Sequence, residues 1–138
     1  MEITLKERLQ SLKAGGLAAI AFTGIYGSSV AIHFWRGETE PIISLLNLGS
    51  ALLSGFLFGV TYRYIIRNDA NPHLRDGAVL AFTLVRSSGL LEGLESPLTE
   101  AFPLLLGLME SFIGFAIARS CLDFALARQW LDPFGSER

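Results

Sequence analysis

The sequence has little cysteine and little charge, and each shortage excludes a class of protein. Its single cysteine, Cys121, cannot form an internal disulfide, so no oxidised framework holds the chain together. Charged residues make up 17% of the 138 residues, against about a quarter in a typical soluble domain. The net charge is −2 and no basic stripe occurs, so we expect no nucleic-acid partner.

Motifs of the common enzyme classes are also missing from the sequence. It contains no HExxH, CxxC or GxSxG motif and no phosphate-binding loop. We therefore expect a protein that is not an enzyme and that holds no cofactor or metal. The length is typical of a single domain.

Hydrophobic residues, in contrast, are abundant and grouped. They make up 51% of the chain, and the mean hydropathy is +0.45. The chain has four long apolar stretches, at about residues 14–34, 41–62, 77–94 and 101–118. At a rise of about 1.5 Å per residue, about 20 helical residues cross a bilayer core of ~30 Å. We therefore predict an all-α membrane protein in which residues 14–128 form a bundle of four transmembrane helices.

The two ends of the chain are less apolar than the bundle. Leu5, Leu9 and Leu12 recur at helical spacing, and Thr4 and Glu7 fit a capping box. Residues 1–13 are therefore expected to form a short amphipathic helix on the membrane surface, or else to extend the first span. Residues 129–138 are expected to form a polar tail.

The distribution of lysine and arginine predicts the orientation of the bundle. Arg36 is alone in the loop after the first span, whereas nine basic residues cluster at the two chain ends and between the second and third spans. Because basic residues stay on the cytoplasmic side, both termini are expected on the cytoplasmic or stromal face. His33 and His73 would then lie on opposite sides of the membrane, too far apart to hold one metal or haem.

Two charges interrupt the apolar stretches at the same expected depth. Arg86 lies in the third stretch and Glu110 in the fourth, each near the middle of the bilayer. A lone charge there costs about 2.5–3.5 kcal/mol. We therefore predict that Arg86 and Glu110 form an intramembrane ion pair. The alternative is that both line the polar path of a small transporter or channel component.

Small residues recur at the spacing that lets helices approach closely. Gly55 and Gly59 form a GxxxG pattern in the second stretch, and Gly107 and Gly114 lie on the same face as Glu110. Such rows are typical of helix packing, either within a bundle or against another membrane protein.

Three segments of the sequence carry a family resemblance: "FGVTYRY" at 58–64, "RNDANPHLRDG" at 67–77 and "AFTLVR" at 81–86. In these segments the chain resembles a family of small membrane proteins of cyanobacteria and chloroplasts. That family includes the thylakoid protein named for defective accumulation of the cytochrome b6f complex. The resemblance implies a non-enzymatic assembly or stability factor for a photosynthetic membrane complex, most of all cytochrome b6f, in the thylakoid or plasma membrane of a cyanobacterium or in a chloroplast thylakoid.

The resemblance also implies that the connection between the second and third spans contacts the partner complex. The candidate contact residues there are Tyr62, Arg63, Arg67, Asp69, His73 and Arg75. The simpler interpretation is an ordinary inside loop whose arginines only set the topology.

Overall fold

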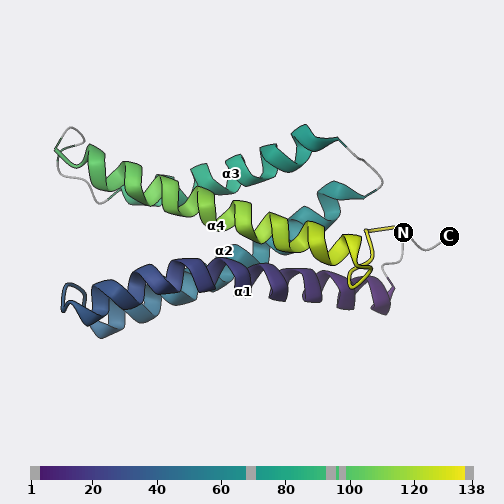
Figure 1. The fold of residues 1–138 in the computed structure, drawn as a ribbon, viewed down its shortest axis with the longest axis horizontal. Helices are drawn as coiled ribbons and strands as arrows, with labels where there is room; N and C mark the ends of the chain where they lie inside the picture. Colours follow the sequence, from purple (N-terminus) through teal and green to yellow (C-terminus); the bar gives the residue numbers. More distant parts are fainter. Residues whose placement is uncertain (1–3, 68–70, 93–95, 97–98, 136–138) are drawn as a thin grey trace.

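The protein is a bundle of four helices. The computed structural model describes residues 4–67, 71–92, 96 and 99–135, and within them it contains no strand. The helices are α1 (Leu5–Trp35), α2 (Pro41–Ile66), α3 (Pro72–Leu91) and α4 (Ala101–Ala127). The beginning of α1 and the end of α4 lie at the same end of the molecule (Figure 1). The all-α prediction with four helices is therefore confirmed.

Three of the helices have the length and composition of membrane spans. In the described part of the chain, α1, α2 and α4 are long and apolar enough to cross a bilayer, which makes the chain a membrane protein in contact with lipid. Helix α3 is not among them. Its 20 residues include Arg75, Asp76 and Arg86, which lower its mean hydropathy.

Each helix extends beyond its apolar stretch at one common end of the bundle. Helix α1 begins before residue 14, α2 continues past 62, α3 begins before 77 and α4 continues past 118. Because neighbouring helices run in opposite directions, these extra turns gather where the first and last helices have their outer ends (Figure 1). We call this the terminal end of the bundle.

The beginning of α1 belongs to the bundle rather than forming a separate surface helix. Helix α1 runs unbroken over 31 residues, and Glu7 and Ser11 are buried. The side chain of Thr4 accepts a hydrogen bond from the Glu7 amide at 3.3 Å, which is the first half of the expected capping box. The predicted leucines 5, 9 and 12 are exposed on the opposite side. Residues 4–13 therefore follow the alternative in which they extend the first span.

The segment after α4 is not a free polar tail. Leu131 and Phe134 are 4% and 7% exposed, respectively, so both belong to the buried core. The amide of Trp130 donates a hydrogen bond to the carbonyl of Ala125 at 2.9 Å and turns the chain back. The expectation for the described part of this segment, 129–135, was wrong because its two apolar side chains find cover on the bundle.

The centre of the bundle is a group of stacked aromatic rings, one from each helix. The Phe115 ring of α4 lies with its centroid 4.4 Å from that of Phe22 in α1 and 5.1 Å from that of Phe58 in α2. Phe82 of α3 packs edge-on against Phe58 at 5.3 Å. Offset and edge-on ring pairs of this kind add stability beyond the area that they bury.

The GxxxG pattern of α2 packs against α1. A Cβ atom at Gly55 would lie 2.8 Å from the Cα of Ala19, and one at Gly59 would overlap the backbone carbonyl of Ala14. Since backbone cannot move aside as a flexible side chain can, only glycine permits this distance. On α4, a Cβ at Gly114 would lie 2.7 Å from the Phe22 ring. These three glycines serve packing inside the bundle.

This close approach predicts a difference between two glycine substitutions in α2. Gly59→Ala should lower stability by about 1–3 kcal/mol, because the added methyl group forces α1 away. Gly49→Ala is the matched control, since a Cβ there meets no atom within 4 Å. Thermal unfolding of the two purified variants in detergent measures the difference. Equal melting temperatures would contradict the packing described here.

Candidate functional site

Arg63 is enclosed at the terminal end of the bundle, where three segments meet. Its side chain is 2% exposed and pairs with Glu7, whose Oε2 lies 2.6 Å from Nη2. Its Nη1 donates to the Ser11 hydroxyl at 2.7 Å and to the Glu7 carbonyl at 3.0 Å, and its Nε donates to the Asp132 carbonyl at 2.8 Å. A buried guanidinium with this many partners fixes the relative positions of α1, α2 and the segment after α4.

The segment after α4 completes the enclosure of Arg63. The amide of Gly135 donates to Oε1 of Glu7 at 3.1 Å. The Phe134 ring lies 5.6 Å from the Arg63 guanidinium carbon and 4.3 Å from the Tyr64 ring centroid. We call Glu7, Ser11, Arg63, Asp132 and Gly135 the Arg63 cluster. In the structure, the Glu7 carboxylate accepts hydrogen bonds from Arg63 and from the Gly135 amide within this cluster.

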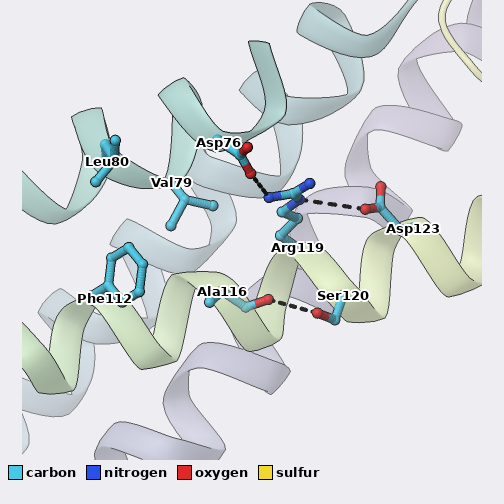
Figure 2. A pocket seen from close by; sticks show the side chains of 8 residues that line it. All are labelled: Asp76, Val79, Leu80, Phe112, Ala116, Arg119, Ser120 and Asp123. Carbon is cyan, nitrogen blue, oxygen red and sulfur yellow. Dashed lines mark hydrogen bonds and ion pairs between the residues drawn. The ribbon is translucent and has the colours of Figure 1, made fainter. Parts of the chain in front are cut away.

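A second charged network joins α2, α3 and α4 nearby, and Figure 2 shows its part between α3 and α4. Arg119 pairs with Asp76 across the two helices and with Asp123 on its own helix, where Nε and Oδ2 are 3.5 Å apart. The Tyr62 hydroxyl donates to Oδ1 of Asp123 at 2.8 Å, and Arg75 lies 3.4 Å from the same oxygen. Asp76, Arg119 and Asp123 also line a cavity of about 330 Å³.

The second network is balanced in charge and internally paired. Its two arginines, Arg75 and Arg119, face its two aspartates, Asp76 and Asp123. Carboxylates whose oxygens accept from arginine and tyrosine donors of neighbouring helices connect those helices. We therefore interpret this network as a structural connection between helices.

These contacts change the interpretation of the residues predicted to touch a partner. Tyr62 and Arg63 are 1% and 2% exposed, so neither is available at the surface. Their side chains point into the bundle because they follow Gly59 on the face that packs against α1 and α4. Arg75 is half-buried in the second network, whereas Arg67 and His73 are exposed. Asp69 lies outside the described residues.

Arg86 and Glu110 line one cavity, as their equal depth suggested, but they do not pair. Arg86 Nη1 donates instead to the hydroxyls of Ser50 and Ser54, at 3.2 and 2.9 Å, and lies 3.4 Å from the Ser50 carbonyl. The predicted ion pair is therefore corrected. Periodicity set the depth of both charges, but the side chain of Arg86 turns towards α2, where two serines one turn apart present oxygens.

The cavity shared by Arg86 and Glu110 is lined by residues from all four helices, many of them with polar side chains. It has a volume of about 550 Å³ and lies in the half of the bundle away from the terminal end. We call it the Arg86 cavity. Gly107 and Gly89 widen it, since neither has a side chain to fill it. Its polar lining residues are Tyr26, Asn47, Ser50, Ser54, Arg86, Glu110 and Ser111.

The other candidate groups make fewer interactions than the residues of these clusters. In the turn after α1, Glu38 Oε2 lies 2.6 Å from His33 Nδ1. This hydrogen bond, together with Arg36, holds the pKa of Glu38 below its ordinary value, so the carboxylate stays ionised until the pH falls through that lowered pKa. Cys121 is a free, half-buried thiol. Within the described part of the chain, no three metal-ligating side chains converge.

No family model, curated protein or solved structure matches the chain. The resemblance of residues 58–86 to the thylakoid family therefore stays a prediction, and function has to be argued from the chain's own residues.

Sequence reasoning missed the Arg63 cluster and most of the second network. Arg119 and Asp123 carry a signal, because oppositely charged residues four apart on a helix face each other. The pairing of Glu7 with Arg63 has no comparable signal, since 56 positions separate them in the sequence. Only the packing of α1 on α2 brings these two side chains together.

The Arg63 cluster predicts a specific double-variant result. Arg63→Met should lower stability by about 3–5 kcal/mol, because it leaves the Glu7 carboxylate buried without a counter-ion. Adding Glu7→Gln should restore part of the loss, and the exposed Arg8→Met is the control. Chemical unfolding in detergent measures the free energy of unfolding of the wild type and of these three variants. A double variant no more stable than Arg63→Met would show that Glu7 is not the charge left unpaired.

The second network predicts a coupling between Tyr62 and Asp123. Tyr62→Phe should cost about 1 kcal/mol, the net value of one hydrogen bond. In Asp123→Asn the same change should cost less, because the acceptor is altered. Tyr64→Phe is the control, since the Tyr64 side chain is 37% exposed. Strictly additive losses in the unfolding measurement would exclude the coupling.

Proposed function

We propose that this protein is a non-enzymatic assembly or stability factor of a membrane complex, and that a partner helix packs on the outer face of α3. The observation that carries the proposal is the position of α3 in the bundle. Helix α3 packs on α4 and, less extensively, on α2, and its backbone does not approach that of α1, which it reaches with the Arg86 side chain. One side of α3 therefore has no neighbour within the described bundle.

The composition of α3 favours protein over lipid on that side. It is the helix that falls short of the apolarity of a membrane span, although both helices that it packs against reach it. A helix of moderate polarity is stabilised in a membrane by contact with other helices. We infer that α3 crosses the membrane as part of a larger assembly, with both chain ends of the bundle on the cytoplasmic or stromal side.

The surface of the outer face of α3 suits close helix packing. Gly77 and Ala81 are exposed and lie one turn apart, on the same side of α3 as the exposed side chains of Leu80 and Leu84. A Cβ at Gly77 would meet no atom within 4 Å. Two small residues four positions apart form the groove into which another transmembrane helix packs.

The terminal end of the same face is polar and exposed. His73 lies on it at the first turn of α3, and Arg67 precedes α3 at the end of α2. Among the described residues of the predicted contact set, these two are exposed and remain available to a partner. They support a docking surface in which helix packing is combined with contacts at the membrane boundary.

The identity of the partner follows from the family resemblance. Residues 58–86, which carry the resemblance, include most of the α3 outer face as well as the end of α2. We therefore propose a photosynthetic membrane complex, and cytochrome b6f first, as the partner.

A small transporter or channel component is the second candidate function. The observation in its favour is the Arg86 cavity, a space lined by residues from all four helices, many of them with polar side chains. Charged side chains within membrane spans commonly mark a substrate or ion path. A carrier would require Glu110 for transport, whereas an assembly factor would tolerate Glu110→Gln.

The docking proposal predicts a separation of two effects in a deletion strain complemented with variants. Gly77→Leu should leave the protein itself at its normal level but lower the amount of its partner complex several-fold, because leucine fills the groove. Gly49→Leu, on the exposed side of α2, is the matched control. Native gels and immunoblots of each photosynthetic complex provide the measurement.

Either of two results would contradict the proposal. One is a normal level of every complex in the deletion strain. The other is equal function of the Gly77→Leu and Gly49→Leu variants, which would remove α3 as the docking face.

A further inference from the structure

We propose that the Arg86 cavity binds a small zwitterion, with its oxyanion on the free edge of the Arg86 guanidinium and its ammonium group against Glu110. This inference concerns a ligand site inside the bundle. It goes beyond the assembly role and does not depend on it.

Arg86 is held in a fixed orientation by two other helices. Its Nη1 is occupied by Ser50 and Ser54 of α2. Its guanidinium carbon lies 5.2 Å from the ring centroid of Phe22 and 4.7 Å from that of Tyr26, both on α1. Stacking on aromatic faces and hydrogen bonds at one nitrogen together restrict rotation of the planar group. The side chain is therefore organised before any ligand arrives.

The remaining donors of Arg86 form an edge that suits an oxyanion. All described hydrogen bonds of this side chain come from Nη1, which leaves Nε and Nη2 without a partner among the described residues. These two N–H groups point in parallel, and their spacing matches two oxygens of a carboxylate or phosphate. A bidentate contact of this kind is stronger than one to a single point charge.

Glu110 supplies the opposite charge in the same cavity. Its Oε1 is buried and has no hydrogen-bond partner in the described structure. A carboxylate only accepts hydrogen bonds, so a ligand has to bring the donor. A simple anion would satisfy Arg86 but face the carboxylate, and a simple cation would have the converse difficulty. A ligand that carries both charges satisfies both side chains.

The size and position of the cavity fit a small ligand. Its volume of about 550 Å³ is within the range of small-molecule sites, roughly 300–1,000 Å³. Ser50, Val85 and Gly89 are exposed members of its lining, so the cavity reaches the surface of the bundle. The oxyanion and ammonium could belong to a free metabolite or to a zwitterionic lipid headgroup, which present the same chemistry.

The test uses the full chain, purified in an uncharged detergent, and two probes. Glycerophosphoethanolamine carries a phosphodiester and an ammonium group, and glycerol 3-phosphate carries an oxyanion without the ammonium. Calorimetric titration should show saturable binding of the first probe and at least about tenfold weaker binding of the second, because the second places its charge against Glu110 without a donor of opposite charge.

Substitutions assign the two halves of the ligand. Arg86→Lys should weaken binding of glycerophosphoethanolamine at least about tenfold, since lysine keeps the charge but loses the fork. Glu110→Gln should abolish the preference between the two probes and leave the melting temperature near that of the wild type. Arg128→Lys, exposed and outside the cavity, is the control and should bind as the wild type does.

Native mass spectrometry of protein taken from membranes distinguishes the sources. Retained phosphatidylethanolamine that is lost in Arg86→Lys would assign the site to a lipid headgroup. Binding of the free probe without any retained lipid would assign it to a soluble zwitterion. The proposal is overturned if the wild type does not bind glycerophosphoethanolamine at millimolar concentration, or if Arg86→Lys binds it equally well. Should Arg86→Lys fail to fold, an unchanged probe preference in Glu110→Gln overturns it as well.

Discussion

The structure depends on the close approach of the α1 and α2 backbones, which Gly55 and Gly59 permit. This contact sets the register between the two helices. The same register determines which residues of α1 and α2 meet at each following turn. Gly55 lies against Ala18 and Ala19, and Gly59 against Ala14. One turn further along α2, Arg63 meets Ser11 and Glu7. A shift of one residue between the helices would bring Arg63 opposite different side chains and leave a buried charge without its partner.

The polar groups of the bundle are divided between two levels. The Arg63 cluster and the Asp76–Arg119–Asp123 network occupy the terminal end, where the helices extend beyond their apolar stretches. Both are internally paired and hold the helices together. The Arg86 cavity lies deeper in the apolar part, and its two charges are not paired with each other. Buried polar groups without partners are uncommon, and a bound ligand or water is one explanation for them. The division separates paired charges from unpaired ones within one small bundle.

The sequence predicted the helices and their close packing but not the side-chain partners. Hydropathy identified the apolar stretches because lipid contact acts on the average of many residues. Gly55 and Gly59 were recognisable because their effect is local. The partner of Arg86 was not, since periodicity gives the depth of a side chain and not the direction in which a long one turns. The burial of Phe134 could not be predicted either, because a few apolar residues after a helix carry no periodic signal.

The return of residues 129–135 onto Arg63 has a consequence for biogenesis. Asp132 and Gly135 complete the Arg63 cluster, yet they leave the ribosome after all four helices have been made. Arg63 therefore enters the membrane boundary before its full set of partners exists, and its Nε stays solvated until the segment after α4 has folded back. The cluster can therefore close only after all four helices have been synthesised. A chain that has formed the four helices but not this return segment therefore presents an open, partly hydrated helix end at Arg63.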